Sequence, residues 1–194
     1  MKSKIKVGYN CINLTLPYSW KSPTLTNILR NRDFLKNSIE HNMMLLGDII
    51  EFNITNGFKL FRVPTNLLPF LSHIDVSSNY KELDIFNRED IMSEFKTIRG
   101  KVRKNDLIIS MHPGQYNVLN SQKPEVVKQT LKELEMQSRI LELLGGKYLI
   151  IHIGGRYNSK EESLKRTIEV TNNYLSDNVK SKLLFENDDK TYNS

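Results

Sequence analysis

The sequence has little cysteine, no long apolar run and no signal peptide, the features that would indicate a secreted or membrane protein. Cys11 is the only cysteine among 194 residues, so no disulfide bond can form within the chain. No apolar run approaches the ~18 residues that a membrane-spanning helix needs, and the N-terminus lacks the long apolar centre of a secretory signal peptide. We therefore expect a cytoplasmic protein with no membrane contact and with a buried, unreactive thiol.

Charge of one sign does not dominate the chain either. Lys and Arg total 28 against 22 Asp and Glu, a net charge of +6, which permits a polyanionic partner but does not require one. The clearest basic cluster, residues 101–104, precedes an apolar run. At this place, basic residues at the solvated C-terminus of a helix explain the cluster better than a polyanion-binding site does. An apolar fraction of 39% over 194 residues fits a single domain with a substantial core.

Three short apolar runs that end in chemically active side chains organise the sequence. Residues 107–116 (LIISMHPGQY) and 148–157 (YLIIHIGGRY) each contain a histidine, then a turn and a tyrosine, and residues 182–189 (KLLFENDD) end in acids. The runs recur every ~35–40 residues, about the size of one strand-plus-helix unit. This spacing predicts a parallel barrel in which each strand end supplies one metal or substrate ligand.

The first half of the chain shows the same alternation of strand-like and helix-like segments. Residues 5–12 and 58–63 alternate apolar and polar positions, which predicts two strands, the second ending at Pro64. Apolar positions in residues 26–55 recur at helical spacing, and Asn56-Gly57 supplies a left-handed stop.

The later helices carry start signals. Asn87 is placed to cap one helix, Pro124 fits the first position of the next, and Ser159 with Glu162 forms a capping box for a third. The positions expected on the inner faces of these helices are Ile91, Phe95, Ile98 and Val102, then Val127, Leu131, Leu134, Ser138 and Leu141, and then Leu164, Ile168 and Tyr174. Five strands alternating with helices form the βα pattern, either as an open sheet that is complete or as a truncated eight-fold barrel.

Three candidate metal ligands, His112, His152 and Glu186, end three successive predicted strands. In a parallel sheet their side chains would emerge at the same rim. Imidazole and carboxylate together suit zinc, manganese or iron, although a polar cap on the core also explains a single histidine at a strand end.

Other candidate residues lie near predicted strand ends. Tyr9 and Asn10 stand at the end of the first strand and His73 closes the loop after the second, and each fits a structural role as well as a functional one. Gln115 and Tyr116 place an amide beside an aromatic ring, a combination suited to hydrogen bonding and stacking with a base.

Five sets of residues, spread over the whole chain, resemble one known family in order and with compatible gaps. They are 8–16 (GYNCINLTL), 61–64 (FRVP) with 68–73 (LPFLSH), 111–116 (MHPGQY), 151–155 (IHIGG) and 185–189 (FENDD). Together these motifs resemble the UV damage endonuclease family.

The resemblance implies a (β/α)8 TIM barrel related to endonuclease IV, which nicks DNA immediately 5′ to ultraviolet photoproducts by means of divalent metal ions. It implies manganese, with zinc or magnesium as alternatives, and damaged double-stranded DNA as the partner. By the matching motifs, His112 and His152 would bind one metal, and Glu186 would bridge it to a second and act in catalysis.

The same resemblance assigns roles to the remaining candidates. Gln115 and Tyr116 would enter the duplex at the lesion. Tyr9 and Asn10 would line the site of the damaged nucleotide, and His73 would act beside the scissile phosphate.

Members of the family are longer than this chain, and their later strands supply further ligands. We therefore expect residues 1–194 to form one domain, the N-terminal part of a barrel truncated after the fifth strand, and the full-length enzyme to be a monomer associated with the nucleoid. A metal-dependent sugar isomerase or epimerase on the same barrel is one alternative. An inactive remnant is another, because a missing part of the barrel leaves two sheet edges open.

Overall fold

The computed structural model describes residues 5–73, 75–76 and 85–187. Its centre is a parallel sheet in the order β1-β2-β3-β4-β5, formed by Gly8–Asn10, Leu60–Val63, Ile108–Met111, Tyr148–His152 and Leu183–Glu186. Each strand pairs with the next one along the chain, and the intervening segments contain helices. This is the arrangement of five consecutive units of a (β/α)8 barrel, as the sequence predicts.

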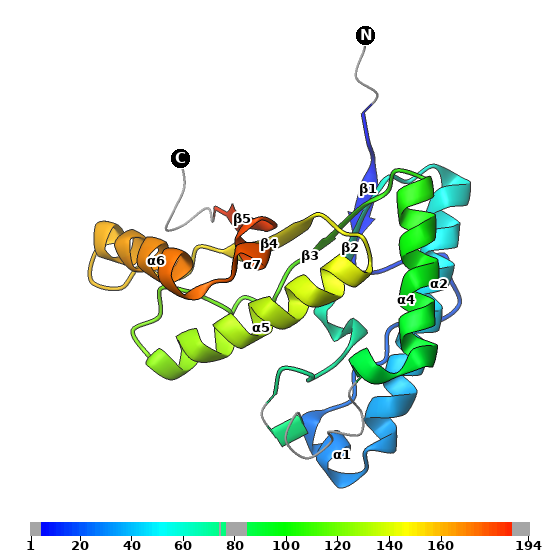
Figure 1. The fold of residues 1–194 in the computed structure, drawn as a ribbon, viewed down its shortest axis with the longest axis horizontal. Coiled ribbons are helices and arrows are strands. Elements are labelled where there is room, and N and C mark those ends of the chain that lie inside the picture. The colour runs from blue at the N-terminus through cyan, green and yellow to red at the C-terminus, as the bar shows by residue number, and fades with distance from the viewer. Residues whose placement is uncertain (1–4, 74, 77–84, 188–194) are drawn as a thin grey trace.

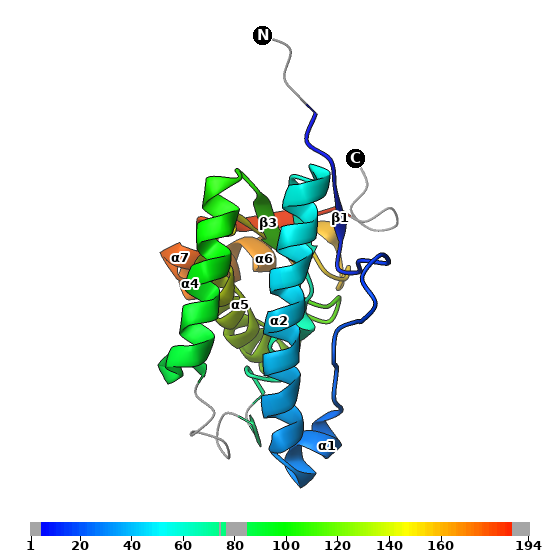
Figure 2. The same cartoon turned by 90° about the vertical axis from the view of Figure 1, so that its right-hand side faces the viewer.

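The helices cover one face of the sheet (Figures 1 and 2). They are α1 (Leu25–Arg30), α2 (Asp33–Asn56), α4 (Glu89–Lys104), α5 (Pro124–Leu143), α6 (Lys160–Tyr174) and α7 (Asp177–Lys180), with 3-10 turns η1 (Thr65–Leu67) and η3 (Ile85–Asn87). Within the described ranges, no helix is long and apolar enough to cross a membrane.

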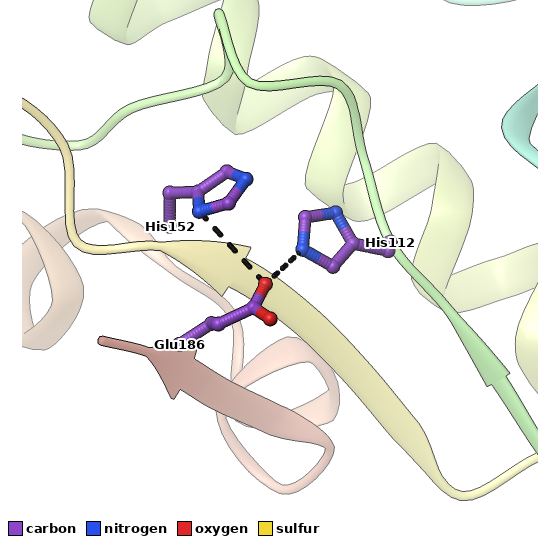
Figure 3. A group of neighbouring side chains, drawn as sticks. All are labelled: His112, His152 and Glu186. Carbon is purple, nitrogen blue, oxygen red and sulfur yellow. Dashed lines mark hydrogen bonds and ion pairs between the residues drawn. The ribbon is translucent and has the colours of Figure 1, made fainter. Parts of the chain in front are cut away.

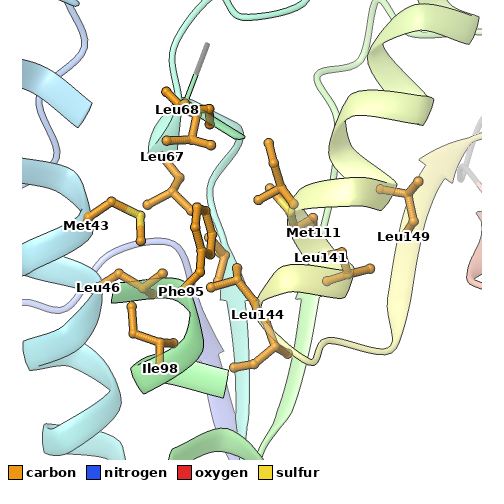
Figure 4. Packing of buried hydrophobic residues seen from close by; sticks show 14 of the residues in the cluster. Met43, Leu46, Leu67, Leu68, Phe95, Ile98, Met111, Leu141, Leu144 and Leu149 are labelled. Carbon is orange, nitrogen blue, oxygen red and sulfur yellow. The ribbon is translucent and has the colours of Figure 1, made fainter. Parts of the chain in front are cut away.

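The core lies between the helices and the covered face of the sheet (Figure 4). Alternate strand residues, such as Phe61, Ile109 and Leu149, are almost fully buried there. The residues between them, such as Arg62 and Ser110, are only partly buried, since they project from the opposite face. In a barrel that opposite face lines the interior, so the polar residues at its upper rim are free for function.

Two of the predicted segments in the first half differ from the structure. The first strand is Gly8–Asn10 and not residues 5–12, because Cys11 adopts a positive φ of 53° that turns the chain. The single helix expected over residues 26–55 is two helices, since Asn31 is extended and its side chain accepts a hydrogen bond from the amide of Asp33. The stop at Gly57 is confirmed, with φ 75°.

The predicted helix starts had mixed outcomes. Asn87 does not cap α4, because it lies in η3 and Arg88 occupies the cap position, where its side chain forms no capping hydrogen bond. Pro124 begins α5, and the Ser159 hydroxyl accepts the amide N–H of Glu162 at the start of α6. Both of these starts are confirmed.

The inner face of α6 was predicted wrongly. Ile168 and Tyr174 are 58% and 64% exposed, while Ser163, Thr167 and Val170 face the core. The small hydroxyl residues pack inward because Ser163 exchanges hydrogen bonds with the backbone of Tyr157, which ties the helix start to the preceding loop. By contrast, Ile91, Phe95, Ile98 and Val102 of α4 are all buried, as predicted.

Candidate metal centre

The strand register brings three candidate ligands to one end of neighbouring strands. His152 lies directly opposite Glu186 in the β4–β5 pairing, and His112 immediately follows the last residue of β3. The preceding residues Met111 and Ile151 are buried under the helices, so both imidazoles project from the other face of the sheet. Figure 3 shows the three side chains converging.

The distances define a tight cluster. Nε2 of His112 lies 2.6 Å from Oε2 of Glu186, and Nδ1 of His152 lies 3.8 Å from the same oxygen. The two imidazole centroids are 4.8 Å apart. The hydrogen bond from His112 lowers the pKa of the Glu186 carboxyl, against the opposing effect of partial burial. Glu186 is therefore held as a carboxylate, the form that binds a metal ion.

His112 is oriented by a second contact on its other nitrogen. Its Nδ1 lies 2.8 Å from the carbonyl oxygen of Pro113, so this nitrogen must carry the proton. Nε2, which donates to Glu186 here, would bind a metal ion through its lone pair once the ion has replaced its proton. A backbone carbonyl that fixes the tautomer in this way is the usual support for a metal-binding histidine.

The donor set fits a divalent metal ion. One ligand atom from each residue can be chosen so that all three lie within 4.8 Å of one another. Two imidazole nitrogens and one carboxylate oxygen are ligands that zinc, manganese and iron accept. Because two ligands of one ion stand about 3 Å apart at ordinary bond lengths, Glu186 must withdraw slightly from His112 when an ion binds.

Glycine after His152 serves packing. Gly154 has φ 105°, and a Cβ added there would lie 2.3 Å from Oδ1 of Asn120. Because any side chain would clash at this turn, packing within the protein is enough to require glycine here.

The first strand places Tyr9 away from the cluster. Its hydroxyl donates to Oδ1 of Asn53 in α2 and accepts from Asn13, and its ring packs edge-on against Phe58 and Phe61. Burial raises the pKa of this hydroxyl, against the lowering effect of the two amides. Asn10, at the end of β1, is exposed.

The remaining predicted residues lie in loops at the same end of the strands. His73 is 36% exposed by its side chain, with Nδ1 at 3.8 Å from Oδ2 of Asp75. Gln115 and Tyr116 lie in the loop between β3 and α5, where Tyr116 is 81% exposed. The structure thus brings together His112, His152 and Glu186, and Gln115 and Tyr116 line one pocket together with His152. Asp188 and Asp189 of the fifth motif lie outside the described residues.

Sequence reasoning missed Arg62. This residue of β2 pairs with Ser110, two positions before His112, so it lies on the same face of the sheet as the cluster. Its positive charge contributes to the lowered pKa of Glu186. The sequence could have indicated Arg62, because it is a charged residue between the buried apolar residues Phe61 and Val63 of β2 and so must project from the other face of the sheet.

Comparison with known proteins identifies the family of this chain. The family model described as UV-endonuclease UvdE matches residues 5–194. The chain belongs to this family. UvdE relatives include the UV DNA damage endonuclease of Clostridium perfringens, which is 30% identical over 97% of this chain and 44% of its own length. Another, from Bacillus cereus, is 27% identical over 81% of this chain and 47% of its own length. The chain thus spans about half the length of these relatives.

Solved structures agree with the UvdE assignment. The crystal structure of SacUVDE matches with a TM-score of 0.86 and 32% identity, over 97% of this chain and 63% of that one. D-psicose 3-epimerase matches with a TM-score of 0.51 and 17% identity, over 76% of this chain and 48% of that one. The epimerase shares the fold alone. The predicted fold class and family are therefore confirmed.

Proposed function

We propose that this chain supplies part of the active site of a UV DNA damage endonuclease. The enzyme would hydrolyse the phosphodiester bond immediately 5′ to a photoproduct in double-stranded DNA. The observation that carries the proposal is the convergence of His112, His152 and Glu186 at the strand ends of a chain that belongs to the UvdE family.

The metal site is assigned to those three residues. His112 is kept in the binding tautomer by the Pro113 carbonyl, and Glu186 is kept ionised by its imidazole neighbours. We propose that the ion held there is Mn²⁺, with Zn²⁺ or Mg²⁺ as alternatives. A divalent ion at this site would neutralise phosphate charge and lower the pKa of a bound water molecule. Glu186 and His73 are the residues that we assign to catalysis.

Lesion recognition is assigned to the loop after β3. Tyr116 exposes 81% of its surface beside an exposed amide, Gln115, and a ring so exposed is available to stack on a base. A photoproduct weakens stacking and pairing, so extrusion of the damaged nucleotides costs less there than in intact duplex. We place the extruded nucleotides against Asn10 and Tyr9 at the end of β1.

Location and assembly complete the proposal. We place the enzyme in the cytoplasm in association with the nucleoid, as a monomer. We also propose that residues 1–194 behave as one domain, which is supported by a cluster of buried apolar residues that joins the helices and strands of the described residues.

The test is nicking of supercoiled plasmid by the purified full-length enzyme with Mn²⁺, with and without prior ultraviolet irradiation. We expect nicks that require both irradiation and metal. The double substitution Gln115→Ala with Tyr116→Ala should abolish the preference for irradiated DNA, while Tyr174→Ala, an exposed tyrosine on α6, serves as the matched control.

Equal nicking of irradiated plasmid by the Gln115→Ala, Tyr116→Ala protein and the wild type would contradict the lesion assignment. Turnover of free sugars with no affinity for DNA would contradict the endonuclease assignment itself.

A further inference from the structure

The face of the sheet that carries the metal ligands also carries one permanent cation. Arg62 of β2 is the only lysine or arginine in the five strands of the described chain. Its neighbours Phe61 and Val63 are buried under the helices, so its side chain projects from the opposite face. In a barrel that face lines the interior, where a charged group loses part of its hydration and gains from a partner of opposite charge.

The strand register places Arg62 between two groups of site residues. It lies opposite Asn10 in the β1–β2 pairing and opposite Ser110 in the β2–β3 pairing. Ser110 stands two residues before His112 on the same face of the sheet. Arg62 therefore lies between the end of β1, where we place the damaged nucleotides, and the metal centre.

Arg62 forms no ion pair with a carboxylate in the described part of the chain. Glu186, the carboxylate of the cluster, pairs with His112 and His152. The lowered pKa of Glu186 comes mainly from its hydrogen bond with His112, and the charge of Arg62 contributes to it, so the guanidinium lies near the cluster without joining it. An incoming anion could bind Arg62 without first displacing a protein carboxylate.

The chemistry of this stretch suits a phosphate group. A guanidinium presents its N–H donors as a planar fork that binds two phosphate oxygens at once, and it stays charged at any working pH. Asn10 and Ser110 place an amide and a hydroxyl on the two neighbouring strands, and neither carries a negative charge that would repel an anion. Arg62 with these neighbours is therefore better suited to a phosphodiester than to a cation or an apolar group.

We propose that Arg62 binds a phosphate of the DNA backbone between Asn10 and the metal ligands, and so positions the strand for hydrolysis. The inference deepens the proposed function and rests on it for one point, that the anion is DNA. Arg62 supplies a permanent positive charge from the protein itself, which neither the two histidines nor Glu186 provides.

The test is binding of a duplex oligonucleotide with one photoproduct to the full-length enzyme, followed by fluorescence anisotropy at several salt concentrations with a chelator present. Arg62→Met should weaken binding about tenfold, the effect of one lost hydrogen bond to a charged group. The slope of the logarithm of the binding constant against that of the salt concentration should fall by about 0.9, because one fewer phosphate is neutralised. Arg103→Met, at an exposed position near the end of α4, is the matched control and should change neither quantity.

A second variant separates the charge of Arg62 from its shape. Arg62→Lys keeps the charge but not the planar fork, so it should restore the salt slope without the full affinity. Wild-type affinity in Arg62→Lys would overturn the inference even if Arg62→Met did not fold. An unchanged salt slope in folded Arg62→Met would overturn it as well.

Metal binding separates a phosphate contact from support of the metal ligands. Thermal unfolding with added Mn²⁺ should show that Arg62→Met binds the ion at least as tightly as the wild type, because a nearby positive charge has been removed. Weaker Mn²⁺ binding together with unchanged DNA binding would overturn the inference and make Arg62 a positioning residue for Glu186.

These outcomes are distinct from those of the nicking test. An enzyme that binds DNA through Arg62 but never nicks irradiated plasmid would refute the proposed function and retain the phosphate contact. An enzyme that nicks irradiated plasmid, and whose Arg62→Met variant binds the duplex as tightly as the wild type, would refute the phosphate contact and retain the function.

Discussion

Replacement of Glu186 by glutamine separates the metal role of this carboxylate from its role in the fold. In the described chain, Glu186 is the one carboxylate of the metal cluster, and it also accepts a hydrogen bond from His112 at 2.6 Å. Because its side chain is 42% exposed, we expect the loss of this ion pair to cost less than about 1 kcal/mol of the free energy of unfolding. Without metal, the melting temperature of Glu186→Gln should stay within about 4 °C of the wild type.

With metal the two proteins should differ clearly. An ion at one hundred times its Kd stabilises the native state by about 2.7 kcal/mol, which raises the melting temperature of a chain of this size by about 5–11 °C. Loss of even a supporting group around a metal lowers affinity by about 10–100-fold, and loss of a ligand lowers it at least as much. A hundredfold loss would leave only about 0.4 kcal/mol of stabilisation at the same metal concentration.

The assay is thermal unfolding followed with excess Mn²⁺ and with a chelator, with Glu169→Gln on the exposed side of α6 as the control. It should be run above pH 6. The lowered pKa of Glu186 means that the stability from this carboxylate is complete above its unfolded value of 4.5 and is lost as the pH falls through the lower folded value. A metal-dependent rise as large in Glu186→Gln as in the wild type would refute the reasoning.

Five further substitutions test the packing and the helix ends of the fold. Leu141→Ala should lower the free energy of unfolding in denaturant by about 2–5 kcal/mol, because Leu141 is fully buried, whereas Leu14→Ala at a 93% exposed position should change it by less than about 0.5 kcal/mol. Gly154→Ala should destabilise the protein because of the 2.3 Å clash with Asn120, and Gly100→Ala, with nothing within 4 Å, should stabilise α4 by about 0.5–1 kcal/mol. Ser159→Ala should cost about 1 kcal/mol, because it removes the cap of α6. Circular dichroism at increasing urea measures all of these, and a transition with several steps would count against a single domain.

Local signals in the sequence were enough to locate the elements and the ligands. The apolar stripe of α4, the proline that begins α5 and the serine that caps α6 are short-range features, and each acts within a few residues of itself. His112, His152 and Glu186 could be named in advance because the ends of parallel strands share one rim.

Contacts between distant segments decided what the sequence could not. The hydrogen bond of Tyr9 with Asn53 joins residues far apart in the chain, and no periodic pattern in the sequence indicates it. The same holds for the ion pair of His112 with Glu186 and for the charge of Arg62 near Glu186. Residue types and spacing determined which ligands the chain offers, and tertiary structure decided their distances and orientation, because these depend on register and packing.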